Sequence, residues 1–259
     1  MRRTRRRCAS AASALLRAGI THGDRIAIWA PNRKEWIVAA IASQLAGAAV
    51  VPLNTRLKGG ETGDILRRTS AKMLFMVDAF LGTDYPALIK NEDLPALKRI
   101  IHFESDWTDF LAEGDLSDHE VDAALAQCSA DDVSDIMFTS GTTGIPKGVL
   151  TTHGRILPMF ENWTKLVDLR RDDPYLIINP FFHSFGFKAG WVAAMIVGAM
   201  IIPMAVFDVQ KAIDHIEHDR VAFIPGPPTI FQALLAELSG RKFDSSSLRS
   251  AMTGAATVP

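Results

Sequence analysis

The sequence lacks an excess of charge of either sign, and it has few cysteines. Its 28 lysines and arginines nearly balance 29 aspartates and glutamates, which leaves a formal net charge of −1. Since no basic face dominates, we expect no nucleic-acid partner. The two cysteines, Cys8 and Cys128, stand far apart and have no spacing typical of a metal or redox site. We expect free thiols in a cytoplasmic protein.

An uninterrupted apolar run that would suit a membrane span is also lacking. The charge-free segment 189–207 is long enough on paper, but Gly198 and Pro203 interrupt it. We interpret this segment as a buried helix followed by a buried strand, and we expect no transmembrane segment. The arginine-rich start MRRTRRR resembles a targeting peptide, but Arg17 interrupts the apolar stretch behind it. A solvated helix start is the preferred interpretation.

Helical patterns alternate with short apolar runs along the chain, and no internal repeat or low-complexity tract is present. The predicted strands are 24–29, 48–53, 72–77, 97–103, 135–139, 148–152, 175–179, 200–204, 221–225 and 248–254. The predicted helices are 8–19, 31–48, 61–70, 155–169, 187–199, 209–219 and 227–238, with a surface helix and a connection in 105–132. Such alternation predicts an α/β fold with parallel sheets flanked by helices. We expect a first portion, 1–130, and a second portion, 131–259.

Polar residues before three of the helical patterns predict their N-termini. Asn32 with Glu35 forms a capping pattern, and Thr152 and Asp208 are predicted caps of the helices that follow them. Pro158 predicts a kink or a late start in the helix after Thr152.

The stretch TSGTTGIPKG, residues 139–148, follows the predicted strand 135–139 directly. Glycines allow positive φ and a close approach of backbone amides, which together form a concave nest for anionic oxygens. Hydroxyls add donors, and Lys147 adds a positive charge suited to phosphate. The pattern differs from the common nucleoside-triphosphatase loop, because Gly148 follows the lysine where that loop has Ser or Thr. It predicts a phosphate-binding loop; a flexible turn of small residues is the alternative.

The longer stretch DIMFTSGTTGIPKGVLTTH resembles the signature of the adenylate-forming (AMP-binding) superfamily, which comprises acyl- and aryl-CoA synthetases, luciferases and peptide-synthetase adenylation domains. GDRIAIWAPNRKEW and GAAVVPLNTRL resemble the N-terminal strands of this family, NPFFHSFG its second core motif, and TGAATVP the loop that meets the acyl group and the adenine. The resemblance covers essentially the whole chain and implies a partial N-terminal AMP-binding domain.

This resemblance implies a two-step ligation that uses ATP, Mg²⁺ and coenzyme A. A carboxylate attacks the α-phosphate to give an acyl-adenylate and pyrophosphate, and a thiol then displaces AMP. The resemblance implies that the β- and γ-phosphates contact Thr139, Ser140, Gly141, Thr142, Thr143, Gly144 and Lys147. It also assigns Gly254, Ala255 and Ala256 to the loop that meets the acyl group and the adenine.

His183 stands among Phe181, Phe182 and Phe185. The residues alone leave open a packed ring with one satisfied nitrogen. The resemblance instead implies a catalytic position at the junction of the ATP, acyl and pantetheine sites. The pair His215 and His218 has no third ligand at a suitable spacing, which favours a solvated helix face over a metal site.

Peptide-synthetase domains have an aspartate near the position of His183 that pairs with an amino group, and FFHSFGF offers none. A buried, unpaired ammonium would be costly among phenylalanines, so we expect an acid without an α-amino group. The combination of NPFFHSFGFKAG, PGPPTIFQALL and FDSSSLRSAMTGAATVP looks especially similar to bacterial fatty-acid-CoA ligases, including those that activate the propionate side chain of sterol-derived rings.

The resemblance ends at Pro259, and the C-terminal half of the family is absent from the sequence. That half contains the glutamate that holds magnesium, the aspartate that binds the ribose, the hinge and the domain with the adenylation lysine. We therefore expect this chain alone to be inactive. Three hypotheses stay open: an acyl-CoA ligase of a fatty or ring-linked acid, a non-catalytic nucleotide-binding remnant or regulator, and an amino-acid adenylation domain. A homodimer also stays open.

Overall fold

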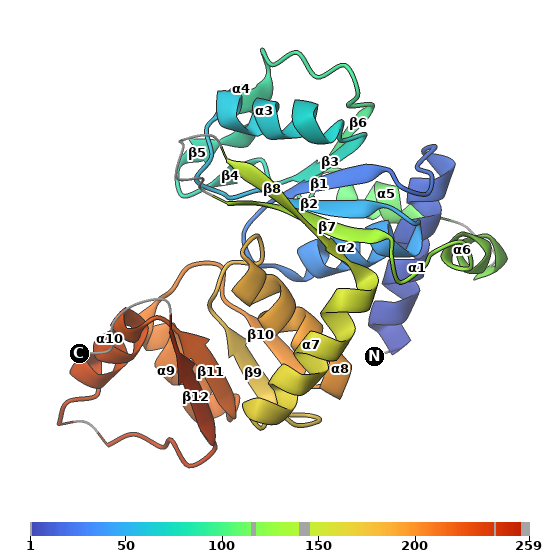
Figure 1. Cartoon of the computed structure of the whole chain (residues 1–259). Helices are drawn as coiled ribbons and strands as arrows, with labels where there is room; N and C mark the ends of the chain where they lie inside the picture. Colours follow the sequence, from blue (N-terminus) through green and yellow to red (C-terminus); the bar gives the residue numbers. More distant parts are fainter. Residues whose placement is uncertain (1, 115–117, 140–145, 241, 255–259) are drawn as a thin grey trace. The chain divides into compact units, whose positions relative to one another are not determined.

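The computed structural model describes residues 2–114, 118–139, 146–240 and 242–254. Two compact units divide the chain, Met1–Arg155 and Ile156–Pro259 (Figure 1). The sequence placed the division between its two portions after residue 130. The units divide later because the strands on either side of the glycine-rich stretch extend the sheet of the first unit.

The first unit is an α/β layer structure. Its helices are α1 (Arg2–Arg17), α2 (Lys34–Leu45), α3 (Gly59–Thr69), α4 (Tyr85–Ile89), α5 (Trp107–Ala112) and α6 (Asp118–Leu125). Its strands are β1 (Arg25–Trp29), β2 (Ala49–Pro52), β3 (Met73–Met76), β4 (Ala79–Phe80), β5 (Thr83–Asp84), β6 (Arg99–His102), β7 (Val133–Thr139) and β8 (Lys147–Thr152).

The main sheet of this unit has the order β6-β3-β1-β2-β7-β8. Every neighbouring pair is parallel except β7 and β8, which are antiparallel. The prediction of parallel sheets is therefore confirmed for the order β6 to β7 and wrong for β8. Strand β8 returns beside β7 because only the short glycine-rich stretch connects them, whereas a parallel pair needs a longer crossover.

Helices cover both faces of this sheet, which explains why its strands β2 and β3 are apolar throughout. Figure 1 shows α1, α2 and α5 on one face and α3 and α4 on the other. Every residue of β2 and β3 is buried, as expected for parallel strands between two helical layers. Trp29, at the end of β1, is fully buried; its indole N–H donates to the Asn54 carbonyl at 3.0 Å.

The second unit has a parallel sheet of the order β10-β9-β11-β12. Its strands are β9 (Pro174–Ile177), β10 (Met200–Pro203), β11 (Phe223–Gly226) and β12 (Ser250–Thr253). Its helices are the π-helix η1 (Phe185–Val192), α8 (Ala193–Val197), α9 (Val209–His218) and α10 (Pro228–Glu237), and α7 (His153–Leu166) enters it from the first unit.

Two clusters of apolar side chains lie on this sheet. Ile213 and Ile216 of α9 and Leu234 of α10 pack with Leu176 and Ile224 of the strands. On α7, Ile156 and Phe160 pack with Ala189 of η1. The sheet is thus flanked by helices on both faces, as the sequence predicted.

The predicted helix starts have mixed outcomes. The predicted cap Asn32 is wrong: Arg33 is the N-cap residue of α2 and makes no side-chain cap hydrogen bond. The Glu35 carboxylate of the expected capping pair is instead held by the Arg33 Nε at 2.9 Å. Asp208 is confirmed, since its carboxylate accepts from the Lys211 N–H at 2.9 Å. Pro158 lies inside α7, which begins at His153 and so has no late start.

The weakly patterned regions hold the elements that the sequence did not resolve. Strands β4 and β5 pair as a small antiparallel hairpin, whose turn has positive φ at Leu81 and Gly82. In region 105–132, the described residues 105–114 and 118–132 form two short helices, α5 and α6, where the sequence predicted one.

The expectations about targeting, membranes and thiols concern three further regions. The arginine-rich start lies in α1. Segment 189–207 spans the end of η1, α8 and β10, and within the described ranges no helix is long and apolar enough to cross a membrane. Cys8 and Cys128 are both free thiols, as predicted.

Candidate functional site

The two ends of the glycine-rich stretch meet at the end of the β7–β8 hairpin. Thr139, the last residue of β7, is the register partner of Lys147, the first residue of β8. Both residues are exposed. The other predicted phosphate contacts, Ser140, Gly141, Thr142, Thr143 and Gly144, lie outside the described residues. Of the predicted set, the structure therefore brings together Thr139 and Lys147.

Arg68, near the C-terminus of α3, contacts this hairpin on both sides of the glycine-rich stretch. Its Nη1 donates to the Pro146 carbonyl at 2.8 Å, directly before Lys147. Its guanidinium also lies over the Phe138 ring, 5.0 Å from the centroid, directly before Thr139. One guanidinium thus contacts both strands next to the two predicted phosphate contacts. An exposed cation–π contact contributes about 0.5–1 kcal/mol.

Gly148 has a packing reason to be glycine. It faces Phe138 across the antiparallel pair, and a Cβ at this position would lie 3.2 Å from the Phe138 ring and 3.3 Å from the Ile136 side chain. The glycine lets the aromatic ring cover the hairpin where Arg68 stacks on it.

His183 lies in the turn between β9 and η1, in the second unit. Its side chain is exposed, and its Nδ1 accepts from the Phe185 N–H at 3.2 Å. An Nδ1 that accepts leaves the proton of the neutral ring on Nε2, so Nε2 is the nitrogen able to donate to a ligand. Phe181 is fully buried, whereas the Phe185 ring packs edge-on against the Trp163 ring, with 6.1 Å between the ring centroids. The structure therefore favours an available ring at His183 over a packed one.

Tight backbone contacts fix the turn that carries His183. A Cβ on Gly186 would lie 2.2 Å from the Pro180 carbonyl oxygen and 2.3 Å from that of Asn179, so only glycine fits. The helix that follows was predicted from residue 187, but it begins at Phe185 and runs as a π-helix to Val192. π-helical segments occur frequently at functional sites.

Gly254, the described member of the predicted adenine and acyl loop, is exposed and follows β12 directly. Ala255 and Ala256 lie outside the described residues. Strands β9 and β12 belong to one parallel sheet, so their carboxyl-terminal ends lie along the same edge of the sheet. His183 follows the carboxyl-terminal end of β9, and Gly254 follows that of β12. The chain goes from β9 to β10 on one side and returns to β11 on the other, which makes this edge a topological switch point. In open α/β sheets, ligands bind at such points.

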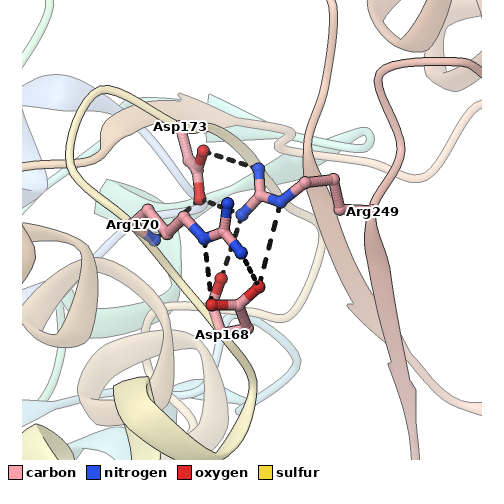
Figure 2. Close-up of polar contacts among 4 residues, drawn as sticks. All are labelled: Asp168, Arg170, Asp173 and Arg249. Carbon is pink, nitrogen blue, oxygen red and sulfur yellow. Dashed lines mark hydrogen bonds and ion pairs between the residues drawn. The ribbon is translucent and has the colours of Figure 1, made fainter.

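An ion-pair cluster holds the start of β12, as Figure 2 shows. Arg249 makes a bidentate pair with the buried Asp173, with distances of 2.8 Å to Oδ1 and 2.7 Å to Oδ2. It also donates to the Asp168 carbonyl at 3.0 Å. Arg170 pairs with the Asp168 carboxylate at 2.9 and 2.6 Å, and its backbone N–H donates to Asp173 at 2.7 Å. This cluster ties β12, and with it Gly254, to the connection between α7 and β9.

The carboxyl of Asp173 shows the electrostatic effect of the cluster. Burial works to raise its pKa, but the hydrogen bonds from Arg249 and from the Arg170 N–H outweigh burial and lower it. The pair is therefore charged at neutral pH.

His215 and His218 both lie on α9. His215 pairs with Asp219 at 2.5 Å, and the His218 Nδ1 lies 3.0 Å from the Asp214 carbonyl. Both contacts run along α9, where His218 is exposed and His215 is partly exposed; the preference for a solvated helix face over a metal site stays a prediction.

Arg68 and Arg249 were not identified from the sequence. Each acts on a residue distant in the chain: Arg68 on Pro146, and Arg249 on Asp173. Two arginines in the last turn of a helix, as in α3, are also typical of ordinary C-terminal charge compensation. Nothing in the local sequence therefore distinguishes Arg68 and Arg249 from arginines that only contact solvent.

Comparison with known proteins shows what this chain is similar to. It is 48% identical over 254 residues to a Mycobacterium tuberculosis ligase named for joining CoA to a 7a-methyl-1,5-dioxo-octahydroindenyl propanoyl group, with 96% of this chain and 50% of that protein covered. It is 44% identical over 261 residues to the ligase of the same name from Rhodococcus jostii, with 96% and 51% covered. The chain thus spans about half the length of these curated relatives.

The fold agrees with this similarity. The inhibitor-bound N-terminal domain of FACL13 from M. tuberculosis matches with a TM-score of 0.87 and 28% identity, covering 99% of this chain and 63% of that one. The family described as AMP-binding enzyme matches residues 1–259. The chain is therefore a member of the AMP-binding enzyme family.

Proposed function

We propose that this chain contributes the phosphate-binding and acyl-binding portion of an AMP-forming ligase that activates a carboxylic acid with ATP and transfers it to coenzyme A. The observation that carries this proposal is the β7–β8 hairpin. It pairs Thr139 with Lys147 at the ends of a stretch that contains three glycines and several hydroxyls. The similarity to CoA ligases over 96% of the chain supports the same reaction class.

In the first step, a carboxylate oxygen attacks the α-phosphorus of ATP, and pyrophosphate leaves. Negative charge grows on the leaving phosphates, and donors fixed in advance near those oxygens stabilise that charge. Lys147 supplies an exposed ammonium as one such donor, and the sequence of residues 139–144 supplies backbone amides and hydroxyls as further donors. In the second step, the thiol sulfur of coenzyme A attacks the acyl carbon, and AMP leaves.

The hairpin fits a polyphosphate better than it fits a metal ion. Residues 138–148 contain no carboxylate, whereas Mg²⁺ is usually bound through one or two carboxylates together with phosphate oxygens. We therefore assign the ATP phosphates to this hairpin and assign no Mg²⁺ ligand within it.

For the acid, we propose a hydrophobic group without an amine, such as a fatty or ring-linked acyl chain. No carboxylate occurs between Leu176 and Val192, so this segment offers no partner for an ammonium. His183 would supply one polar tip through its Nε2 among phenylalanine side chains. The two relatives are named for a ring-linked propanoyl group, which favours the ring-linked class of acid. The reaction is assigned to the cytoplasm, where ATP and coenzyme A are available.

The test is a fusion of this chain to the C-terminal half of the mycobacterial relative, assayed for ATP–pyrophosphate exchange and for CoA thioester formation. A panel of fatty, aryl, ring-linked propionic and amino acids decides the substrate class. We expect turnover of hydrophobic acids and none of amino acids. Faster turnover of any amino acid than of every other acid would reject the CoA-ligase proposal in favour of amino-acid adenylation. ATP binding without exchange for any acid would favour a nucleotide-binding remnant or regulator.

A further inference from the structure

Three side chains with metal-ligating atoms meet in the first unit, away from the glycine-rich hairpin. They are His22 in the turn after α1, Cys128 after α6, and Asp132 just before β7. The ligand atoms of the three residues all lie within 4.8 Å of one another. The closest pair is the His22 Nε2 and the Asp132 Oδ2, at 2.8 Å.

We propose that His22, Cys128 and Asp132 form a binding site for a divalent cation of the zinc class. Imidazole nitrogen, thiolate sulfur and carboxylate oxygen are the three donor types that zinc accepts in proteins. A thiolate disfavours Mg²⁺ and Ca²⁺, which prefer oxygen ligands. Three protein ligands leave the fourth tetrahedral position for a water molecule.

A backbone N–H already orients the Asp132 carboxylate. The Ser129 N–H donates to the Asp132 Oδ2 at 2.7 Å. A donor of this kind, one shell out from a metal, fixes the orientation of its ligand. The Cys128 thiol donates weakly to the Ala124 carbonyl oxygen at 3.7 Å and to that of Gln44 at 3.9 Å, and it gives up both contacts when it coordinates as the thiolate.

Gly47 fixes the position of His22 from the other side. Its φ is +78°, which disfavours any side chain, and a Cβ there would lie 3.1 Å from the His22 Cδ2. The imidazole therefore rests directly on the backbone of this turn. Its position is set by packing as well as by the hydrogen bond to Asp132.

Movements of about one ångström would convert the cluster, whose ligand atoms lie within 4.8 Å of one another, into a coordination sphere. Two ligand atoms on a tetrahedral zinc lie about 3.3 Å apart, given bond lengths of about 2.0–2.1 Å. The 2.8 Å contact between His22 and Asp132 must therefore lengthen by less than one ångström. The side chains of His22 and Asp132 are 41% and 29% exposed, so an ion can reach them from solvent. On binding, Cys128 gives its thiol proton to water and coordinates as the thiolate.

The location points to a structural effect. His22 and Asp132 are separated by 110 residues, and Asp132 lies at the N-terminal end of β7, whereas the glycine-rich stretch follows its C-terminal end. A bound ion would join the α1–β1 turn to the α6–β7 turn. Because only the folded chain presents all three ligands together, binding should raise the melting temperature.

The experiment uses the 259-residue chain without an affinity tag, freed of metal with a chelator. Zn²⁺ binding is measured by calorimetry, and Co²⁺ binding by the thiolate-to-cobalt charge-transfer band in the ultraviolet. The ligand variants are His22→Gln, Cys128→Ser and Asp132→Asn. Two matched controls are Cys8→Ala, which removes the other thiol, and His215→Gln, which removes an exposed histidine that also pairs with an aspartate.

We expect one Zn²⁺ per chain and a Co²⁺ charge-transfer band for the wild type and both controls. Each ligand variant should lose about tenfold or more in affinity, and Cys128→Ser should lose the band. Binding by Cys128→Ser equal to that of the wild type would overturn the site, as would no binding by the wild type at micromolar Zn²⁺.

A second measurement needs no variant and stays decisive if a variant does not fold. Zn²⁺ should slow alkylation of Cys128 by a maleimide, read by mass spectrometry, while the buried Cys8 serves as the internal reference. Equal alkylation rates of Cys128 with and without Zn²⁺ would contradict coordination by its sulfur.

Discussion

Arg68 shows how a single residue outside the glycine-rich stretch can set the geometry of that stretch. Its guanidinium contacts the Phe138 ring on β7, the Pro146 carbonyl beside β8 and, at 3.3 Å, the Asp64 carboxylate on its own helix. Contacts in three directions define where a planar guanidinium lies. The residue next to Pro146 is Lys147, so Arg68 acts on the phosphate contact through the backbone.

Replacing Arg68 with Gln in the fusion enzyme is expected to raise KM for ATP and to lower the free energy of unfolding by about 1 kcal/mol, because the contacts with Phe138 and Pro146 are lost. The loss of one charge-assisted hydrogen bond at a partly exposed position should cost about 1 kcal/mol, or roughly fivefold in KM. Arg67→Gln is the matched control, because the neighbouring Arg67 is similarly exposed and pairs with Glu92 away from the hairpin. Equal KM values for both variants would remove Arg68 from the site.

Lys147→Ala addresses the phosphate contact itself. The loss of its charge from a partly dry site should cost about 2–3 kcal/mol, which lowers adenylate formation roughly 30- to 150-fold. The melting temperature should change little, because the side chain is exposed. ATP–pyrophosphate exchange by the fusion enzyme measures the effect, and Lys165→Ala, an exposed lysine on α7, is the control. A folded Lys147→Ala enzyme within about threefold of the wild-type rate would contradict the assignment.

At the scale of elements, two pieces of local structure decide where the predicted site residues lie. The β7–β8 hairpin returns the chain to Lys147 beside Thr139, and the Arg249 cluster fixes the start of β12 before Gly254. Backbone pairing between β7 and β8 fixes the hairpin, whereas charged side chains fix the start of β12. The two elements therefore respond differently to pH.

Asp173→Asn should destabilise the second unit at neutral pH by about 2–3 kcal/mol, because a hydrogen-bonded charge pair is broken and Arg249 loses its partner. The pKa of Asp173 is lower in the folded state than the ordinary value of 3.8. A lowered pKa stabilises the fold at pH values above 3.8, and this contribution is lost as the pH falls below that value through the folded pKa. The difference between wild type and variant should therefore shrink at acid pH.

Urea denaturation of the 259-residue chain at neutral and acid pH measures this difference. Asp172→Asn is the control, since Asp172 is 83% exposed and its closest arginine nitrogen lies at 3.7 Å. We expect Asp172→Asn to change stability by less than about 0.5 kcal/mol at either pH. A destabilisation by Asp173→Asn that stays constant with pH would show that the ion pair is not its cause.

Sequence periodicity located most of the strands and helices, because each buried strand and amphipathic helix carries a local signal. The strand β3 and the Asp208 cap are two such cases. Contacts between distant residues carry no such signal. For this reason the antiparallel place of β8, the roles of Arg68 and Arg249, and the meeting of His22 with Cys128 and Asp132 appear only in the fold. The failed Asn32 cap has a local cause, since Arg33 engages the Glu35 carboxylate.

The candidate site residues likewise divide into those that a local sequence pattern predicts and those that only the fold brings together. A glycine-rich stretch directly after a strand indicates phosphate binding from sequence, and the structure adds only the pairing of its two ends. For His183, the sequence left open a packed ring or a position at the junction of the ATP, acyl and pantetheine sites. The exposed side chain speaks against a packed ring, and the position at that junction stays a prediction. The substrate depends on the shape of a whole pocket, which neither local pattern nor a single side chain defines.

The last prediction concerns the whole molecule: the 259 residues alone should form no acyl-adenylate at a useful rate. The hairpin offers donors for the leaving phosphates, but the resemblance assigns the ligands of the ribose and of Mg²⁺ to a part of the family that this sequence does not contain. Positioning and charge stabilisation together supply most of the barrier reduction in such reactions, so losing both removes many orders of magnitude in rate. The measurement is ATP–pyrophosphate exchange with mixed carboxylic acids, for the chain alone and for its fusion to the C-terminal half of the mycobacterial relative. Exchange only by the fusion would support the assignment of the ribose and Mg²⁺ ligands to the C-terminal half, whereas robust exchange by the chain alone would refute it.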